Sequence, residues 1–439
     1  MSIAILVLLN LLTPLAVLGV VVKFMLSPRR GLLRGLPQEL NERLGGLDAR
    51  TRARLAGRPV LWVHAASAGE VAAATEFLRR VHAMPDAPAV LLTTMTQTGR
   101  EAARRLPQVA AASLVPLDCW LAVWRFLRQA RPYALVLVET ELWPNIIELS
   151  ARAGLRLGLV NGRVSERSFP RYRLIAPLLR PFLRRIDRVA ARTKADAQRL
   201  AALGVHEERI RVVGNMKYDR LASGDGRGRE ELERLGWRDA PVFVAASTHP
   251  GEEEIVLAAF QDLRGRFPSL KLVLAPRHVE RSGDTAATLR ALGLSFCRLG
   301  GQADSDACVL LVDAMGWLPS FFTCAAAAFV GGTLVPVGGH NVLEPAMAGI
   351  PVLFGPHVAH TREAAEALTA CGGGFKVVDA ASLARALQPF LESPEAARES
   401  GRKANALVRS WQGATDRTLS HLAAVLAPPQ SQHGARRMI

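Results

Sequence analysis

The sequence predicts an α/β protein built from two doubly wound domains, each around a parallel sheet. Short, continuous apolar runs rich in Val, Leu and Ala alternate with helical patterns along the chain, which is typical of strands buried on both faces in βαβ units. A polar, glycine-rich segment, "SGDGRG" at residues 223–228, separates two sets of such runs and indicates a linker. The 439 residues are enough for two domains of this kind, and we find no repeat of solenoid length.

The expected domain boundaries follow from the positions of these runs. In the first domain, residues 32–222, the strand candidates are Pro59–Ala65, Ala89–Thr94, Ala134–Glu139, Arg156–Asn161, Arg188–Ala191 and Ile210–Val213. In the second domain, residues 229–426, they are Val242–Ser247, Lys271–Pro276, Cys308–Val312, Ala325–Gly331 and Pro351–Phe354. The tail beyond residue 427 is rich in Pro, Gln and Arg, and we expect it to fray.

Composition limits the classes of function. The hydrophobic fraction of 49% and the charged fraction of 21% are those of a folded globular protein. The formal net charge of +16 favours an anionic partner such as nucleic acid, phosphorylated lipid or an acidic bilayer. The five cysteines are scattered and form no CxxC pair, which argues against a disulfide framework or a zinc site and for a reducing compartment.

A membrane anchor is expected at residues 1–26. The run Ser2–Val22 carries no charged residue and has roughly the 20-residue length that spans a bilayer core. A cleaved signal peptide is the alternative, but no Lys or Arg precedes the run and no clear cleavage site follows it. Four basic residues come directly after the run: Lys23, Arg29, Arg30 and Arg34. By the positive-inside rule they keep the main body in the cytoplasm, while Pro14 leaves room for a helix lying in the interface.

Polar clusters follow two strands of the first domain, at the sheet edge where doubly wound proteins bind ligands. In "HAASAGE", Ser67 belongs to a tight turn and Glu70 falls on the first turn of a helix expected at Val71–Val81. Glu70 is a candidate catalytic base, or else an ordinary acid that complements the helix dipole. In "ETELWPN", Glu139 and Glu141 would point the same way if the strand continued, which favours a cation or a hydroxyl-bearing ligand between them. The alternative is that one of the two is solvated.

Similar clusters follow strands of the second domain. In "STHPGEEE", Ser247 or Thr248 is the expected helix N-cap and leaves hydroxyl and N–H groups for a phosphate. In "LAPRHVER", Arg277 and His278 leave a strand together. Arg277 can hold a phosphate or carboxylate bidentately, or form a surface ion pair. The "GNMKYD" stretch puts Lys217 near the expected hinge, where a cation could face a ligand.

The stretch "FVGGTLVPVGGHNVLEPAMAGIPVLFG" indicates a nucleotide site. Its glycines allow the backbone to approach a phosphate closely, and a short helix follows that ends at Gly349. Glu344, near the start of that helix, would repel a phosphate and is better placed to accept hydrogen bonds from ribose hydroxyls. Neither GxxxxGK[ST] nor an opening GxGxxG is present, which argues against an NTPase and against NAD binding.

Taken in order, these motifs resemble those of the 3-deoxy-D-manno-octulosonic acid (Kdo) transferases of lipid A biosynthesis, which are GT-B glycosyltransferases. The resemblance covers nearly the whole chain. It rests on the N-terminal anchor and on "SAGE", "TTMTQTG", "VETELWPN", "NGRVSERS", "GNMKYD", "STHPGEEE", "APRHVER", "FVGGTLVPVGGHNVLEPA" and "GPH". It implies two Rossmann-like domains facing a cleft, CMP-Kdo as donor and a phosphorylated, acylated glucosamine disaccharide of the lipid IVA type as acceptor.

The resemblance also implies residue roles. Glu70 would be the general base, supported on the acceptor side by Ser67, Glu139 and Glu141. The donor-binding residues would be Lys217, Ser247, Thr248, Arg277, His278, Gly332, Thr333, Asn341 and Glu344. With the base opposite the leaving group, the anomeric configuration should invert. Cations and helix N-termini would meet the charge of departing CMP, so we expect no metal and no cofactor.

Two other functions remain open from the sequence: a membrane-tethered binding protein without turnover, and a GT-B enzyme that uses a different donor such as a UDP-hexosamine. The carboxylates retained in "SAGE", "ETE" and "HNVLEP" argue against the first. Together, the anchor and the resemblance place the catalytic domains on the cytoplasmic face of the inner membrane. How many Kdo residues are transferred does not follow from the sequence.

The segment Arg163–Arg188 mixes many arginines with apolar residues, which suits a helix lying in a membrane interface. A solvated basic face on a packed helix is the alternative. Nucleic-acid binding is disfavoured, because the same chain carries an expected anchor and no nucleic-acid motif.

Overall fold

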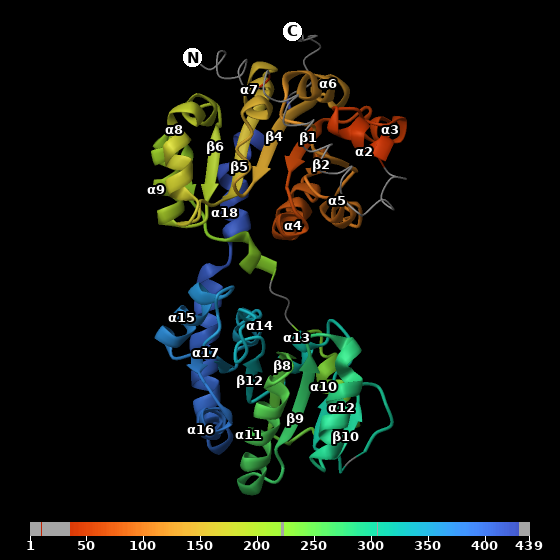
Figure 1. Cartoon of the computed structure of the whole chain (residues 1–439), viewed down its shortest axis with the longest axis vertical. Helices are drawn as coiled ribbons and strands as arrows, with labels where there is room; N and C mark the ends of the chain where they lie inside the picture. Colours follow the sequence, from red (N-terminus) through yellow and green to blue (C-terminus); the bar gives the residue numbers. More distant parts are fainter. Residues whose placement is uncertain (1–9, 11–35, 221–223, 305, 430–439) are drawn as a thin grey trace, which may run out of the picture. The chain divides into compact units, whose positions relative to one another are not determined.

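The computed structural model describes residues 10, 36–220, 224–304 and 306–429, and the chain forms two compact units (Figure 1). The first unit contains the described residues up to Arg220 and those from Gln412 onward, and the second ends at Trp411. The anchor expected at residues 1–26 lies outside the described residues apart from Asn10. Among the helices that the structure describes, none has both the length and the apolar character needed to span a bilayer.

The first unit is built on a seven-stranded parallel sheet in the order β3-β2-β1-β4-β5-β6-β7. Its strands are β1 (Val60–His64), β2 (Ala89–Thr94), β3 (Ala111–Leu114), β4 (Pro132–Val138), β5 (Arg156–Gly162), β6 (Arg188–Ala191) and β7 (Ile210–Val212). Strands β1 and β2 are buried along their whole length and β4 at every residue except Tyr133, which explains why they appear in the sequence as apolar runs.

Helices cover both faces of this sheet. They are α2 (Leu36–Arg43), α3 (Ala49–Leu55), α4 (Ala68–His82), α5 (Gln97–Arg104), α6 (Trp120–Ala130), α7 (Pro144–Arg152), α8 (Phe169–Leu183), α9 (Lys194–Leu203), α18 (Ala414–His421) and α19 (Ala423–Leu426). Helices α6 to α9 share one core with the sheet, and α4, α5, α18 and α19 share the core on the other face. A 3₁₀ helix, η3 (Met216–Arg220), is the last element of the first unit before the chain enters the second unit.

The second unit repeats the plan with a seven-stranded parallel sheet in the order β10-β11-β9-β8-β12-β13-β14. Its strands are β8 (Val242–Thr248), β9 (Lys271–Pro276), β10 (Phe296–Arg298), β11 (Val309–Leu311), β12 (Ala327–Val330), β13 (Val352–Phe354) and β14 (Gly374–Lys376). Its helices are α10 (Arg227–Arg234), α11 (Glu252–Arg266), α12 (Ser282–Ala291), α13 (Leu318–Phe322), α14 (Leu343–Ala348), α15 (Arg362–Cys371), α16 (Ala380–Glu392) and α17 (Pro394–Trp411).

The two doubly wound sheets confirm the predicted fold class, and three strands were missed: β3, β10 and β14. All three are edge strands, and each has only three or four residues. An edge strand pairs on one side only and needs a shorter apolar run than a central strand. Such runs do not stand out from the loops around them in a single sequence.

The C-terminal end of the second domain differs from the boundary expected at residue 426. Residues from Gln412 onward belong to the first unit. There Leu422 is fully buried, and a Cβ on Gly158 of β5 would lie 2.7 Å from Leu422 Cδ2. Asp219 accepts hydrogen bonds from the N–H of Gly413 at 2.8 Å and of Thr415 at 2.6 Å. The returning helices therefore complete a core that the N-terminal part of the chain leaves open.

Each sheet reverses its winding direction at one place, and these places position the candidate sites. In the first sheet β1 lies between β2 and β4, and in the second sheet β8 lies between β9 and β12. Loops diverge at the carboxyl ends of such strands and leave a crevice. The loops that follow β1, β4, β8 and β12 hold most of the functional residues predicted from the sequence, and Arg277 and His278 follow the neighbouring strand β9.

We expect Leu422→Ala to lower the free energy of unfolding of the first unit by about 2–5 kcal/mol, because it opens a cavity in the core shared with β5. Leu174→Ala is the matched control, since the Leu174 side chain in the same unit is 83% exposed, and it should change stability by less than about 0.5 kcal/mol. Calorimetric unfolding of both variants checks this. Equal effects would mean that α18 and α19 do not contribute to the core.

Candidate functional site

Glu70 is held at the carboxyl end of β1 by its own loop. Helix α4 starts at Ala68, earlier than expected, and the Oγ of its N-cap Ser67 accepts a hydrogen bond from the Glu70 N–H at 3.3 Å. In return, Glu70 Oε2 accepts from the N–H of Ala66 at 2.6 Å, and the Ser67 hydroxyl donates to Oε1 at 3.3 Å. The half-buried carboxylate thus lies on the first helical turn, as expected, with a fixed orientation.

Glu141 is held by a chain of polar groups that runs through the core of the first unit. Its Oε2 accepts from the indole N–H of Trp143 at 2.6 Å and lies 3.4 Å from Nε2 of the fully buried His64. On the other side of the ring, His64 Nδ1 lies 3.0 Å from the hydroxyl of Thr93, which accepts from the indole N–H of Trp62 at 2.8 Å. His64 Nδ1 also lies 3.0 Å from the carbonyl oxygen of Thr93, so the buried ring has polar neighbours on both sides.

Glu139 faces a different partner. Strand β4 ends at Val138, and Glu139 has a positive φ of 64°, so its side chain leaves the line of the strand. Its Oε1 lies 3.2 Å from Lys217 Nζ and 3.3 Å from the Asn161 side-chain amide. Asn161, at the end of β5, also has a positive φ, of 52°. Strained non-glycine residues of this kind concentrate at functional sites.

Glu139 and Glu141 were expected to point the same way only if the strand continued, and this condition is not met, because β4 ends at Val138 and the backbone turns at Glu139. Lys217 lies on η3 within the first unit and pairs with Glu139, and its expected role in binding the donor stays a prediction. The structure does bring Glu70, Glu139 and Glu141 into one cluster, since the charges of the other two both act on Glu70. We call these three residues the carboxylate cluster.

Within the carboxylate cluster the pKa of Glu70 is raised and that of Glu141 is lowered. Burial raises the pKa of Glu70, against the hydrogen bond from Ala66, and the charges of Glu141 and Glu139 add to the rise. Burial also acts on Glu141, but its contacts with His64 and Trp143 outweigh it and hold its pKa below the ordinary value. One carboxylate is thereby kept ionised while its neighbour becomes a stronger base, a pattern found where two acids have different roles.

In the second unit the loop of residues 331–341, here called the glycine loop, is organised by Glu252. This carboxylate is fully buried at the start of α11. It accepts hydrogen bonds from the backbone N–H of Gly332 at 2.7 Å, Thr333 at 2.9 Å and Leu334 at 2.8 Å, and from His249 N–H at 2.9 Å. The buried charge is thus compensated by four donors.

These bonds change the roles expected for several donor-site residues. The N–H groups of Gly332 and Thr333 bind Glu252 and so are not directed at a phosphate. Thr333 is fully buried, and its hydroxyl donates to Val330 O at 2.6 Å. Thr248 is also fully buried, and its hydroxyl donates to Glu253 Oε1 at 3.1 Å. Both threonines therefore hold the loops together.

Helix α11 also starts differently from the prediction. Its N-cap is Gly251 in the left-handed conformation, not Ser247 or Thr248. Strand β8 continues through Thr248, and Ser247 has a positive φ of 55°. The strain at Ser247 occurs at the carboxyl end of a central strand, as it does for Glu139 and Asn161 in the first unit.

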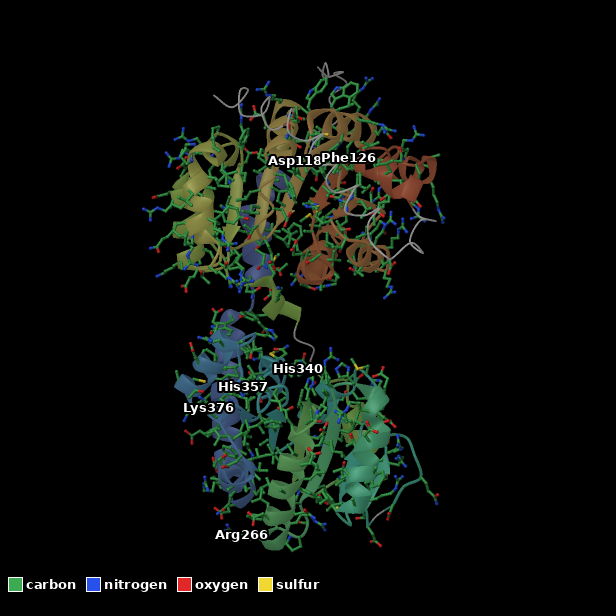
Figure 2. All side chains as sticks on the ribbon, viewed as in Figure 1. Asp118, Phe126, Arg266, His340, His357 and Lys376 are labelled. Carbon is green, nitrogen blue, oxygen red and sulfur yellow. The ribbon has the colours of Figure 1, made fainter. Side chains whose placement is uncertain are left out.

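Three histidines gather beside the glycine loop. His340, which is labelled in Figure 2, has its Nε2 2.7 Å from His249 Nε2. The rings of His340 and His249 are stacked, and His278 lies at the edge of the His249 ring. One nitrogen of the close pair must donate and the other must accept, so the two rings cannot both be protonated on these atoms. Burial, followed by the charges of His249 and Arg277, lowers the pKa of His340 to about 4. Arg277 and His278 thus lie together beside the loop.

Asn341 ends the glycine loop, and Glu344 follows it on α14. The Asn341 side-chain amide donates to Glu344 Oε1 at 3.0 Å, and the Asn341 Oδ1 accepts from the N–H of Leu343 at the start of α14. Burial raises the pKa of Glu344, although the bond from Asn341 opposes it. A carboxylate in this position can accept hydrogen bonds from hydroxyl groups of a ligand.

Reasoning from the sequence missed Glu252, His249, His340 and Asn161 as members of these sites. A signal was present for Asn161, because "NG" directly after an apolar strand favours a positive φ, which Asn tolerates. Glu252 is one of three consecutive acids, and nothing in the sequence tells that Glu252 and Glu253 are buried and Glu254 is not. The contact between His249 and His340 joins residues 91 positions apart and becomes visible only in the fold.

Comparison with known proteins gives three kinds of match. A family model described as 3-deoxy-D-manno-octulosonic-acid transferase (kdotransferase) matches residues 38–220. The chain is similar to the 3-deoxy-D-manno-octulosonic acid transferase of Haemophilus influenzae, at 34% identity over 82% of this chain and 86% of that protein. It is equally similar to that of Bordetella pertussis, at 34% identity over 87% and 90%.

Among solved structures, a UDP-GlcNAc 2-epimerase from Neisseria meningitidis covers 83% of this chain and 100% of its own, with a TM-score of 0.55 and 14% identity. At that identity the likeness concerns the fold alone. The C-terminal CMP-Kdo binding domain of WaaA from Acinetobacter baumannii covers 42% of this chain and 96% of its own, with 26% identity and a TM-score of 0.40.

Proposed function

The chain belongs to the 3-deoxy-D-manno-octulosonic acid (Kdo) transferase family, and from that premise we propose how its residues move Kdo from CMP-Kdo to a lipid A precursor of the lipid IVA type. The observation that carries the proposal is Glu70, a half-buried carboxylate that its own loop holds at the carboxyl end of β1. Its raised pKa makes it a stronger base than an exposed acid. A base is what transfer to a sugar hydroxyl requires.

In the proposed reaction Glu70 takes the proton of the acceptor hydroxyl as the oxygen bonds to the anomeric carbon of Kdo. The bond from that carbon to the phosphate oxygen breaks, and CMP leaves with the electron pair. A single displacement of this kind inverts the anomeric configuration. Glu141 stays ionised through its contacts with Trp143 and His64, and its negative charge keeps Glu70 basic.

The donor would be held by the second unit. Glu344 and Asn341 would bind the ribose hydroxyls, and Arg277, next to the histidines of the glycine loop, would meet the charge of the phosphate. We propose that Arg277 stabilises the leaving group without a metal ion or cofactor. Transfer that persists in excess chelator would support this, and transfer restored only by added Mg²⁺ would contradict it.

The competing functions differ in which nucleotide they bind. An enzyme that uses a UDP-hexosamine should be stabilised against heat by UDP more than by CMP, and a binding protein of another kind by neither. The proposed function predicts stabilisation by CMP. Mass spectrometry of the product formed from CMP-Kdo and purified acceptor then gives the number of Kdo residues transferred.

We further propose that the enzyme works on the cytoplasmic face of the inner membrane, with residues 1–26 as anchor. Helix α8 buries one side against the first unit, and on its other side Leu174 is 83%, Leu178 51% and Ile175 44% exposed, among exposed arginines. In the same helical layer, exposed Trp120 begins α6. Arginine with exposed Leu and Trp suits the headgroup region of an anionic bilayer, where a lipid acceptor lies.

Glu70→Gln should lower kcat by about 10²–10⁴-fold while leaving the fold and CMP binding intact, because it removes the proton acceptor and keeps the shape. In the wild-type enzyme the base acts only when ionised, so kcat/KM should fall as the pH drops through a raised pKa, above the ordinary 4.5. Glu101→Gln on the surface of α5 is the control. If the Glu70→Gln enzyme has a near-normal kcat, Glu70 is not the base, and its role is to cap helix α4.

Glu344→Ala should weaken CMP binding by about 1.5–3 kcal/mol, the range for hydrogen bonds to a charged group. Isothermal calorimetry with CMP measures this on folded protein. Glu363→Ala, which removes an exposed carboxylate from α15 of the same unit, should leave CMP affinity unchanged. Equal affinities of the two variants would remove Glu344 from the nucleotide site.

Protein lacking residues 1–26 should still sediment with anionic vesicles at low salt and release at high salt, because each arginine near the surface contributes ~1 kcal/mol that salt screens. Neutral vesicles should bind it weakly. Replacing Leu174 and Leu178 by Asp should reduce binding, whereas Asp at exposed Leu292 in the second unit should not. A truncated protein that ignores anionic vesicles at low salt would leave the anchor alone responsible for localisation.

A further inference from the structure

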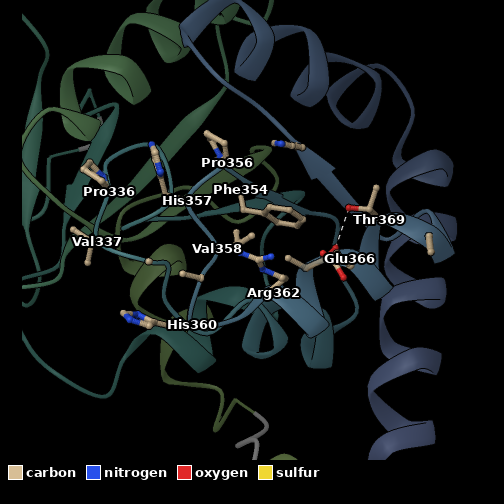
Figure 3. A pocket seen from close by; sticks show the side chains of 16 residues that line it. Pro336, Val337, Phe354, Pro356, His357, Val358, His360, Arg362, Glu366 and Thr369 are labelled. Atoms are coloured by element: carbon tan, nitrogen blue, oxygen red, sulfur yellow. Dashed lines mark hydrogen bonds between the residues drawn. The ribbon is translucent and has the colours of Figure 1, made fainter. Parts of the chain in front are cut away.

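A cavity of about 740 Å³ lies at the carboxyl ends of β13 and β14 in the second unit (Figure 3). Three segments form its walls: residues 336–338 of the glycine loop, residues 354–360 after β13, and one face of α15, with Lys376 at the end of β14. The volume falls within the range of roughly 300–1,000 Å³ that small-molecule sites have. None of the residues predicted from the sequence to bind the donor lines this cavity.

The lining carries more positive than negative groups. Arg362 and Lys376 are opposed by a single acid, Glu366, and the imidazoles of His357 and His360 add N–H donors. Figure 3 shows Arg362 and Glu366 coming from α15, whereas both histidines come from the loop after β13. Between these groups lie apolar side chains: Val337, Phe354, Val358 and Ala365. The cavity therefore suits a small anion with a partly apolar or hydroxylated body.

The walls are joined by hydrogen bonds before any ligand binds. Thr333 accepts from the N–H of Gly355 through its hydroxyl at 2.8 Å and from the N–H of His357 through its carbonyl at 2.9 Å. The N–H of His360 donates to Gly338 O at 2.8 Å. A Cβ on Gly338 would lie 2.6 Å from the His360 ring, so only glycine leaves the ring in place. A site that is already ordered loses little entropy on binding.

The glycine loop connects this cavity with the nucleotide site. One part of the loop, residues 336–338, lines the cavity. The loop ends at Asn341, whose side chain donates a hydrogen bond to Glu344 on α14. We propose that the cavity binds the sugar of the donor, with the sugar carboxylate facing Arg362 and Lys376. This inference rests on the proposed function: Kdo is a sugar acid, whose carboxylate needs cations and whose carbon skeleton and hydroxyls need a larger space beside them.

The donor has two parts, the nucleotide CMP and the sugar acid Kdo, and the proposal places only the sugar acid in the cavity. CMP lacks the sugar acid, so a change in the cavity should weaken the donor and spare the nucleotide. Arg362→Met should raise the KM for CMP-Kdo by about tenfold or more and leave the inhibition constant of CMP within about twofold, since a bidentate contact to a carboxylate is worth at least one factor of ten. Lys376→Met should act in the same direction. The matched control is Arg398→Met, which removes an exposed arginine from α17 of the same unit.

Three outcomes overturn the inference. If the KM for CMP-Kdo stays unchanged in both cavity variants while the wild-type enzyme transfers Kdo, the cavity does not take the sugar. If the inhibition constant of CMP rises as much as KM, the cavity takes the nucleotide. If inorganic phosphate protects the wild type from heat and Arg362→Met abolishes this, but free Kdo gives no protection, the anion is a phosphate. A wild-type enzyme that transfers no Kdo would instead contradict the proposed function itself.

Discussion

The buried carboxylate of Glu252 is the interaction on which the second unit's site depends. A charge removed from water is tolerated only when donors surround it, and here four backbone N–H groups do so. Three of them belong to consecutive residues after β12, so one side chain sets the path of the glycine loop. The position of Thr333, and through it the wall of the cavity after β13, follows from that path.

The first unit uses the same device with other acids. Asp118 accepts from the N–H of Asn145 and Ile146 and so fixes the start of α7, and Asp196 accepts from Val164 N–H. Glu70 belongs to this group as well, because it accepts from Ala66 N–H. Acids at the carboxyl ends of parallel strands thus have two possible uses, which are to order a loop and to face a ligand. Glu70 is placed for both.

That double use explains what the sequence could and could not predict. Buried central strands, the two-unit plan and the place of Glu70 follow from apolar runs and local helix signals, which are properties of adjacent residues. The separation of Glu139 from Glu141 depends on backbone strain at one residue. The hydrogen bond from Thr248 to Glu253 forms because two of three neighbouring acids, Glu252 and Glu253, turn inward. Such choices are made by tertiary packing, and no local pattern encodes them.

The return of residues 412–426 to the first unit makes the second unit an insertion within the first. The ribosome synthesises the chain from its N-terminus, so the segment with Leu422 and Leu426 emerges only after the whole second unit has been made. Until then, the face of the first sheet that these residues cover stays open, with apolar groups in water. The second unit can complete its folding first, and the nascent first unit is the part of the chain that needs protection from aggregation during synthesis.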